Sequence, residues 1–287
     1  MAVDIGGTKM AAALVDRNGA LGPVATCPTP QVPDAEVVWG ALANLIAQVR
    51  SPEGAAVVRC GVGCGGPMSH GGAEVSPLNI PAWRSFPLRS RIEALTGVPT
   101  AVDNDAKALA LGEGWLGAAR EERHFLAMVV STGVGGGIVL DGRLLGGRLG
   151  NAGHIGHVVV EPEGRLCACG GQGCLEAEAS GTAIAKSTGR PASEAPRPVV
   201  QRTGTLVGRA IASVANLLDL RLAVVGGSVA LGFGAPFFEA ARQEVARRAR
   251  LEFAIGTEVR PAGLGADAPL LGAAAVGWRQ AEDGAHG

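Results

Sequence analysis

The sequence has no excess of charge of either sign, no long apolar run and no basic leader. Its formal net charge is −1 over 287 residues, and its basic residues are almost all arginines scattered along the chain. No broad electrostatic attraction to nucleic acid is therefore expected. No run of about 18 apolar residues free of glycine and charge occurs, so no transmembrane helix and no membrane partner are expected. The first residues, Met1-Ala-Val-Asp-Ile5, lack the basic region and the apolar core of a signal peptide.

What the chain does contain is glycine, with 45 residues, and six cysteines. Glycine-rich turns between apolar strands favour an α/β fold. At 287 residues the chain can bury a sizeable core in one large or two medium domains. Three cysteines cluster with a histidine, which fits a reducing, cytoplasmic compartment and a metal better than a disulfide framework. The other three, Cys27, Cys60 and Cys64, are expected to be small buried residues.

A potential metal site lies in the stretch 150–176. Three thiols and one imidazole are the ligand set of a closed tetrahedral zinc site, and the Cys-x-Cys-x-x-x-x-Cys spacing lets one loop wrap one ion. Glycines between the cysteines let the backbone turn sharply. The alternative is three unrelated thiols or a disulfide. Because no open coordination position is implied, the zinc is predicted to be structural. The four potential ligands are His157, Cys167, Cys169 and Cys174.

The N-terminal residues predict a hairpin that could bind phosphate. Residues 1–5 form an apolar strand, Gly6-Gly7-Thr8 a turn, and residues 9–16 a second strand. With no side chains at two turn positions, backbone N–H groups can approach an anion closely. Asp4, at the strand end, could hold Mg²⁺ through water. The spacing of a Walker loop is missing, and a plain tight hairpin is the alternative.

A second copy of this pattern begins about 125 residues later. Residues 124–130 predict a strand, 131–137 a turn rich in threonine and glycine, and 138–140 another strand. Because a strand rather than a helix follows the turn, a dinucleotide fingerprint is a weak interpretation. Two such hairpins facing one cleft would bind a nucleoside triphosphate from both sides. The pair of hairpins resembles the two phosphate motifs of the actin-like ATPase superfamily.

Two further strand ends carry residues suited to ligands. Asp103-Asn104-Asp105 lies between a strand and a helix, where Asp105 is placed to be a general base. Helix N-capping is the alternative for this cluster. Gly226-Gly227 lies between a strand and a helix, where a flat ligand can lie against the backbone. The loop 76–83, bounded by prolines, is a candidate binding loop.

Hydrophobic periodicity predicts the remaining elements. Helices are expected at 34–50, 88–95, 106–116, 175–188, 203–219, 236–250 and 270–278, and strands at 57–64, 100–102, 221–225 and around Val259. The proline-rich stretch 190–199 is expected to be a surface loop.

The stretch Ala152-Gly-His-Ile-Gly-His157, the cysteine loop and Gly173-Cys-Leu-Glu176 together resemble the signature of the ROK family, a group of sugar kinases and sugar-responsive repressors. The resemblance implies a two-domain actin-like ATPase (ribonuclease H-like) fold with a cleft between the domains. The smaller domain would comprise 1–104, with a C-terminal helix of about 270–287 packing back on it; the larger, 105–269, would carry the zinc loop. The repressors add an N-terminal helix-turn-helix, for which this sequence has no room, so the kinase branch is expected.

The resemblance also implies residue roles. Asp105 would take the proton from the 6-hydroxyl of a sugar. The sugar would be bound by Gly65, Gly66, Asn79, Asn104, His154, His157 and Glu176. The phosphates and the nucleotide would be bound by Asp4, Gly6, Gly7, Thr8, Lys9, Thr132, Gly133, Gly226 and Gly227.

One position departs from the family pattern. The family usually has Glu-x-Gly-His, and here the first position is His154. An imidazole, which can donate, accept or carry charge, replaces a carboxylate that accepts from sugar hydroxyls near C1 and C2. The protein could be a glucokinase that tolerates the change, or could prefer a modified hexose such as kanosamine, N-acetylmannosamine or N-acetylglucosamine. Alternatively, His154 could compete with His157 for zinc.

These observations predict an ATP- and Mg²⁺-dependent hexose 6-kinase, glucokinase-like, with a structural zinc ion. A sugar- or nucleotide-binding regulator without turnover is the competing class. Asp105 and both phosphate hairpins are present, which favours the kinase, since a protein without turnover would be free to lose them. The expected partners are a sugar and ATP, and the family is commonly dimeric, so a homodimer is expected.

Overall fold

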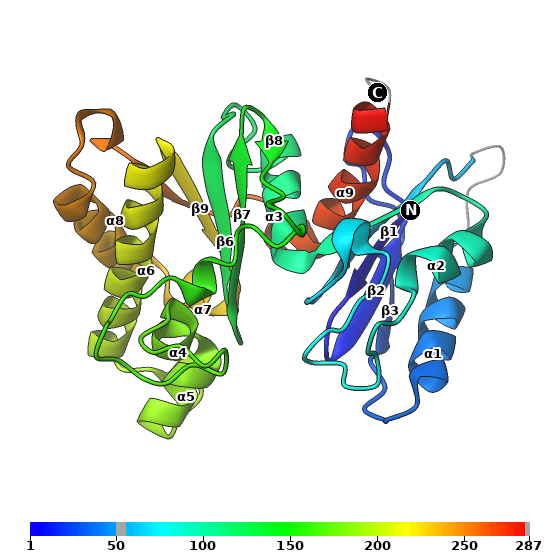
Figure 1. The fold of residues 1–287 in the computed structure, drawn as a ribbon, viewed down its shortest axis with the longest axis horizontal. Helices are drawn as coiled ribbons and strands as arrows, with labels where there is room; N and C mark the ends of the chain where they lie inside the picture. Colours follow the sequence, from blue (N-terminus) through cyan, green and yellow to red (C-terminus); the bar gives the residue numbers. More distant parts are fainter. Residues whose placement is uncertain (50–55, 285–287) are drawn as a thin grey trace. The chain divides into compact units, whose positions relative to one another are not determined.

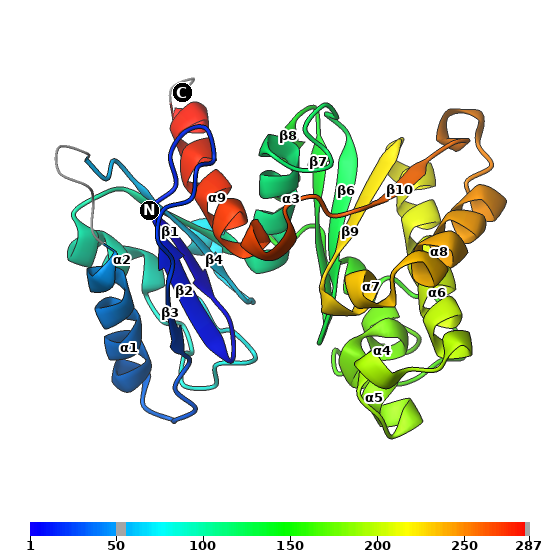
Figure 2. The ribbon, with the colours of Figure 1, turned by 180° about the vertical axis from the view of Figure 1, so that it is seen from behind.

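The computed structural model describes residues 1–49 and 56–284, and these form two compact units. The first unit comprises Met1–Leu116, Gly146–Ala152 and Leu264–Gly287, and the second comprises Gly117–Leu145 and Gly153–Gly263. Figures 1 and 2 show that each unit contains its own sheet flanked by helices. Among the described residues, no helix is both long and apolar enough to cross a membrane.

The first unit is built on a five-stranded mixed sheet. The strands β1 and β2 form an antiparallel hairpin, and β1, β4 and β5 run parallel. The hairpin predicted from the N-terminal residues is therefore confirmed, whereas its partner β3 was not predicted. Across the sheet the strands are β3 (Ala25–Pro28), β2 (Lys9–Ala13), β1 (Ala2–Ile5), β4 (Cys60–Cys64) and β5 (Thr100–Asn104).

Helices cover both faces of this sheet (Figures 1 and 2). The helices α1 (Ala35–Gln48) and α2 (Leu88–Thr96) pack on one face, and α3 (Asp105–Trp115) and α9 (Ala268–Gly284) lie on the other. The Asp34 side chain caps α1 by accepting from the backbone N–H of Glu36 at 2.8 Å. The predicted helix 34–50 is confirmed, except that its last residue, Arg50, lies outside the described residues.

The alternation of side chains along the strands decides which face each helix can approach. Val3 and Ile5 of β1 belong to the large apolar cluster on the α1 side, whereas Ala2 lies in the cluster with α9. A Cβ atom on Gly61 of β4 would lie 1.9 Å from the carbonyl oxygen of Ala273 in α9. The face toward α3 and α9 is therefore lined with small residues, and Asp4 shares it.

The second unit repeats the same strand order. The strands β6 and β7 form an antiparallel hairpin, and β6, β9 and β10 run parallel, so the predicted internal repeat is confirmed. Across this sheet the strands are β10 (Glu258–Pro261), β9 (Leu222–Gly226), β6 (Phe125–Val130), β7 (Val134–Leu140) and β8 (Arg143–Leu144). The helices are α4 (Leu175–Ala179), α5 (Gly181–Thr188), α6 (Arg197–Leu218), α7 (Ser228–Phe233) and α8 (Ala235–Arg248).

Several predicted elements of the second unit were wrong in extent. The turn 131–137 ends early, because β7 already begins at Val134 and its glycines pair with β6. A Cβ atom on Gly136 would lie 2.9 Å from both the Ala127 carbonyl oxygen and the Ile155 side chain, which explains a glycine inside this strand. The predicted helix 175–188 is interrupted at Ser180, which is extended and caps α5.

Helix α3 lies in the first unit, although the predicted division at residue 104 assigned it to the second domain. It packs along α9, where a Cβ atom on Gly112 would lie 3.0 Å from the Cα atom of Gly272. This close helix crossing, possible only with small residues, ties α3 to the N-terminal sheet.

Candidate active site

The parallel strands of the first unit bring several predicted residues to one edge of the sheet. Asp4 of β1 pairs with Gly63 of β4, and Gly63 with Asp103 of β5. Because parallel strands have their carboxyl ends on the same side, the residues that follow them converge there. Gly65 and Gly66 follow β4, and Asp105 follows β5.

Asp4 and Asp105 both lie next to Gly63. A Cβ atom on Gly63 would lie 3.7 Å from Oδ1 of Asp4 and 3.8 Å from Cα of Asp105. Burial, and then the nearby charge of Asp105, raise the pKa of the Asp4 carboxyl to about 7, although Lys9 opposes the shift. A site that disfavours a second negative charge is one in which a cation would be stabilised.

The start of α3 confirms the capping interpretation for one residue of the acidic cluster. Asn104 is the N-cap of α3, and its side-chain oxygen accepts from the Ala106 backbone N–H at 3.0 Å. Oδ1 of Asp105 accepts from the same N–H at 2.8 Å. The capping alternative therefore describes Asn104, while Asp105 is oriented by the first turn of the helix at the edge that also carries Asp4.

Asn79, in the candidate binding loop 76–83, lies against the first hairpin turn. A Cβ atom on Gly7 would lie 2.7 Å from Cβ of Asn79, and one on Gly65 would lie 3.4 Å from Oδ1 of Asn79. Similarly, a Cβ atom on Gly66 would lie 3.5 Å from Nδ2 of Asn104. The glycines thus make room for the two amides, and the structure brings the predicted sugar residues of this unit together.

The first hairpin turn is held by residues that the sequence did not single out. The Thr29 hydroxyl donates to the Gly6 carbonyl at 2.7 Å, and the Gln31 amide donates to the Gly7 carbonyl at 2.7 Å. Thr29 is 3% exposed. Both follow β3, a four-residue edge strand that the sequence analysis did not predict, so no local signal identified them.

Lys107 is a second residue that the sequence did not reveal. Its ammonium contacts Oδ1 of Asp103 at 2.8 Å and donates to the Gly150 carbonyl at 2.9 Å, and the side chain is 5% exposed. A buried ammonium is stable only with such partners. Lys107 therefore anchors Gly146–Ala152, the segment just before the His-x-Gly-His stretch, to helix α3 within the first unit.

The second hairpin turn, Ser131-Thr132-Gly133, is fixed by the corner between α4 and α5. The Gly181 N–H donates to the Ser131 carbonyl at 2.7 Å, and the Thr182 hydroxyl donates to the Thr132 carbonyl at 3.0 Å. The Ser131 hydroxyl also lies 2.9 Å from the hydroxyl of Ser228, the first residue of α7. These hydrogen bonds to the Ser131 and Thr132 carbonyl groups orient the peptide planes of the turn.

Gly226 and Gly227 lie beside this turn, at the end of β9. Gly227 has φ of 95°, and a Cβ atom on it would lie 2.4 Å from the Val130 carbonyl oxygen. A side chain there would be strained and would collide with β6. The glycines predicted to bind the nucleotide and the second turn predicted to bind phosphate are therefore neighbours within the second unit.

The predicted metal ligands converge in the second unit. The ligand atoms of His157, Cys167, Cys169 and Cys174 all lie within 4.8 Å of one another. Sγ of Cys169 is 3.7 Å from Sγ of Cys174, and Sγ of Cys167 is 3.8 Å from Nδ1 of His157. Tetrahedral zinc with bonds of about 2.3 Å to sulfur separates two sulfurs by about 3.8 Å, so the donor set and its spacing fit zinc.

His154 is not a member of this group of ligand atoms within the described residues. Its ring lies roughly parallel to that of His157, with centroids 6.3 Å apart and an interplanar angle of 16°. It is exposed at the start of the short 3₁₀ helix η2 (Ile155–His157). The geometry therefore gives no support to a competition for the metal.

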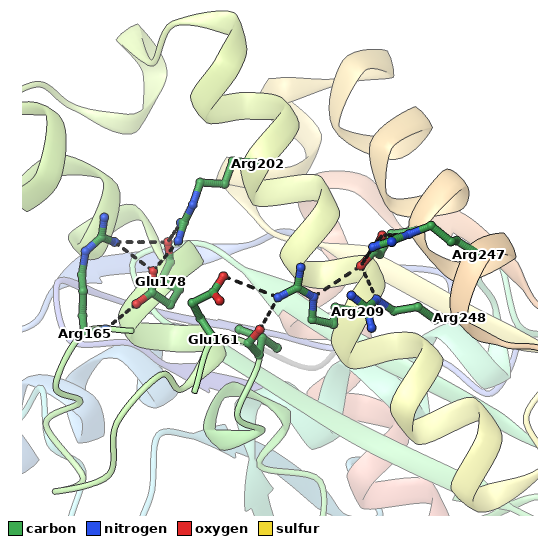
Figure 3. Close-up of polar contacts among 9 residues, drawn as sticks. Glu161, Arg165, Glu178, Arg202, Arg209, Arg247 and Arg248 are labelled. Atoms are coloured by element: carbon green, nitrogen blue, oxygen red, sulfur yellow. Dashed lines mark hydrogen bonds and ion pairs between the residues drawn. The ribbon is translucent and has the colours of Figure 1, made fainter. Parts of the chain in front are cut away.

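An ion-pair network anchors the loop that carries the metal ligands (Figure 3). The Glu178 side chain, 2% exposed, accepts from the backbone N–H of Arg165 at 2.6 Å and from the Arg202 guanidinium at 2.7 Å. Burial alone would raise the pKa of Glu178, but these bonds outweigh it and hold the pKa below its ordinary value. The loop is thereby joined to α6.

Arg209 of α6 makes the second connection (Figure 3). It donates to the Val160 carbonyl and pairs with Glu161 at 3.4 Å and with Glu244 of α8 at 3.3 Å. Arg247 and Arg248 also bind Glu244. Helical spacing could identify only the pairs of Glu244 with Arg247 and Arg248, because the partners of Arg209 lie far apart along the chain.

Each unit has a five-stranded sheet that combines an antiparallel hairpin with parallel strands in the same order, and this repeat defines the class of the fold. Comparison with solved structures confirms it as the actin-like ATPase fold. The sequence pattern of the ROK family matches residues 1–280, and the chain belongs to the ROK family.

Individual relatives are sugar kinases by name. An N-acetylmannosamine kinase of Citrobacter koseri is 36% identical over 250 residues, which cover 82% of this chain and 84% of that protein. The crystal structure of a ROK hexokinase from Thermus thermophilus has a TM-score of 0.86 and 36% identity, covering 98% of each chain. A ROK glucokinase from Streptomyces griseus, in complex with glucose and AMPPNP, has a TM-score of 0.81 and 32% identity, covering 97% of this chain and 98% of that one.

The raised pKa of Asp4 predicts how its removal changes stability. Because folding raises the pKa of this carboxyl to about 7, ionising it costs folding free energy. That cost is small below about pH 4 and grows as pH rises to about 7. Asp4→Asn, which is neutral throughout, should therefore raise the melting temperature above that of the wild type by a few degrees at pH 8.

Thermal unfolding without divalent cations at pH 5 and pH 8 measures this effect. The difference in melting temperature between Asp4→Asn and the wild type should be smaller at pH 5 than at pH 8. Asp34→Asn, at an exposed helix cap that asparagine serves equally well, is the control. A gap that does not depend on pH would show that the carboxyl is not perturbed as described.

Proposed function

We propose that this protein is a sugar kinase that transfers the γ-phosphate of ATP to the 6-hydroxyl of a hexose. The observation that carries the proposal is Asp105, oriented at the head of α3 beside Asp4 at the edge of a sheet whose hairpin turn is suited to phosphate. The names of its relatives, N-acetylmannosamine kinase, hexokinase and glucokinase, support the same reaction class.

The chemistry needs positioning and charge neutralisation more than covalent steps. Asp105 would accept the proton of the attacking hydroxyl late in a loose transition state, so an ionised carboxylate is basic enough. Asn79 and Asn104 would orient the sugar, and the turns Gly6-Gly7-Thr8 and Thr132-Gly133 would bind the phosphates. Asp4 would hold hydrated Mg²⁺, which supplies charge neutralisation at the phosphates when it is bound.

A hexose modified at C2 is the second candidate substrate. A relative named N-acetylmannosamine kinase and one solved with glucose are similarly close to this chain, at 36% and 32% identity. His154 favours the modified sugar, because an exposed imidazole can donate to an acyl oxygen, which the carboxylate usual in the family cannot do.

We propose that the Cys/His cluster holds a structural zinc ion. His157, Cys167, Cys169 and Cys174 supply four ligands, which fills a tetrahedral shell and leaves no position for catalysis. The ion would fix the orientation of His157, whose ring would also reach the sugar near C1. A homodimeric state and a cytoplasmic location stay predictions.

Asp105→Asn should lower kcat by about 10² to 10⁴ because the proton acceptor is lost. The asparagine amide has the size of the carboxylate, and its oxygen can still accept from the Ala106 N–H. Sugar affinity should therefore change little. Coupled ADP release and equilibrium sugar binding measure the two quantities. Asp267→Asn, at an exposed position, is the control. Turnover of Asp105→Asn near that of the wild type would exclude Asp105 as the base.

Metal analysis of the purified protein should find about one zinc ion per chain. Cys174→Ser should lose the ion and lower the melting temperature, because the loop loses its main cross-link, whereas Cys27→Ser, outside the cluster, should keep the ion. A protein that is folded and active with no zinc bound would refute the structural role.

A further inference from the structure

The Glu176 carboxylate lies against the second phosphate turn. Its Oε2 accepts from the backbone N–H of Val134 at 2.9 Å. Val134 directly follows Thr132-Gly133, and a Cβ atom on Gly133 would lie 2.8 Å from the same oxygen. The resemblance to the family assigns Glu176 to a sugar hydroxyl, so this contact with the turn is an additional one.

The carbonyl group of Val134 is enclosed as well. A Cβ atom on Gly156, the residue before His157, would lie 2.2 Å from the Val134 carbonyl oxygen. Helix η2 therefore packs directly on the peptide that closes the turn. The two polar groups of Val134 thus face two segments of the Cys/His loop, one through a hydrogen bond and one through close backbone packing.

The two residues before Glu176 in the chain are both buried. Cys174 is the N-cap of α4, and Leu175, between it and Glu176, is fully buried. Glu176 is half-buried. The neighbours of Glu176 thus hold its backbone at the start of α4, and the hydrogen bond from the Val134 N–H orients its carboxylate.

We infer that Glu176 is a positioning residue that fixes the phosphate turn of the second unit through the Val134 N–H. The inference rests on the proposed function, in which Thr132 and Gly133 bind phosphate. A turn whose N–H groups are oriented before the nucleotide arrives loses less entropy on binding. The carbonyl side of the turn is held by Gly181 and Thr182, and Glu176 completes the support on the N–H side.

Nucleotide binding measured without sugar distinguishes a role of Glu176 in the turn from a role toward the sugar alone. If Glu176 served only the sugar, its loss would leave nucleotide binding in the absence of sugar unchanged. If it also fixes the turn, nucleotide binding without sugar weakens. A neutral amide keeps an acceptor oxygen for the Val134 N–H, so Glu176→Gln should preserve the turn, whereas Glu176→Ala should not.

The experiment is calorimetric titration of the zinc-loaded protein with a non-hydrolysable ATP analogue and Mg²⁺, without sugar. Glu176→Ala should weaken nucleotide affinity about tenfold, as expected for a lost hydrogen bond to a charged acceptor. Glu176→Gln should stay within about threefold of the wild type. Glu163→Ala, an exposed glutamate in the same loop, is the matched control. Glu176→Asp, too short to reach Val134, replaces the alanine variant if that one does not fold.

Two results would overturn the inference. Nucleotide affinity of Glu176→Ala equal to that of the wild type would restrict Glu176 to the sugar. Tighter binding by Glu176→Ala would show that the carboxylate competes with phosphate instead of supporting the turn. A wild-type protein that fails to bind the nucleotide at all would instead contradict the proposed function. Metal content and melting temperature of each variant show whether the loop is intact.

Discussion

Parallel pairing of β1, β4 and β5 determines where the functional side chains of the first unit can lie. Asp4, Gly63 and Asp103 share one row across these strands, and Asp105 follows one strand end. Small residues on the face toward α3 and α9 let both helices approach closely, which partly buries the Asp4 carboxyl near Asp105. The raised pKa of Asp4 is a direct consequence of this arrangement.

The second unit has the same strand order as the first but carries a long loop that its sheet does not hold in place. Its Cys/His loop, from η2 to α4, has little regular structure and must be held by polar contacts. Glu178 and Glu244, both nearly fully buried, would be costly without partners. Arg202 and Arg209 of α6 supply those partners and so tie the Cys/His loop to the helical layer (Figure 3). Truncating one partner would leave a buried charge unpaired.

Patterns that are local in the sequence were predicted well. The two hairpins, the start of the helix predicted at 34–50 and the convergence of the four metal ligands all depend on spacing within one stretch of chain. Contacts between distant stretches were not predictable: Lys107 with Gly150, Thr29 with Gly6, and the partners of Glu178. Their residue types are common on surfaces, and only the fold buries them. The roles of the site residues toward sugar and nucleotide stay predictions.

The central claim is that the site phosphorylates a hexose and that His154 selects which one. ADP release across glucose, mannose, N-acetylmannosamine, N-acetylglucosamine and kanosamine, with the wild type and His154→Glu in parallel, tests it most directly. The account predicts turnover with at least one of these sugars, and a shift of preference toward glucose in His154→Glu. No ADP release with any sugar would contradict the kinase, and an unchanged preference in His154→Glu would contradict the selecting role of His154.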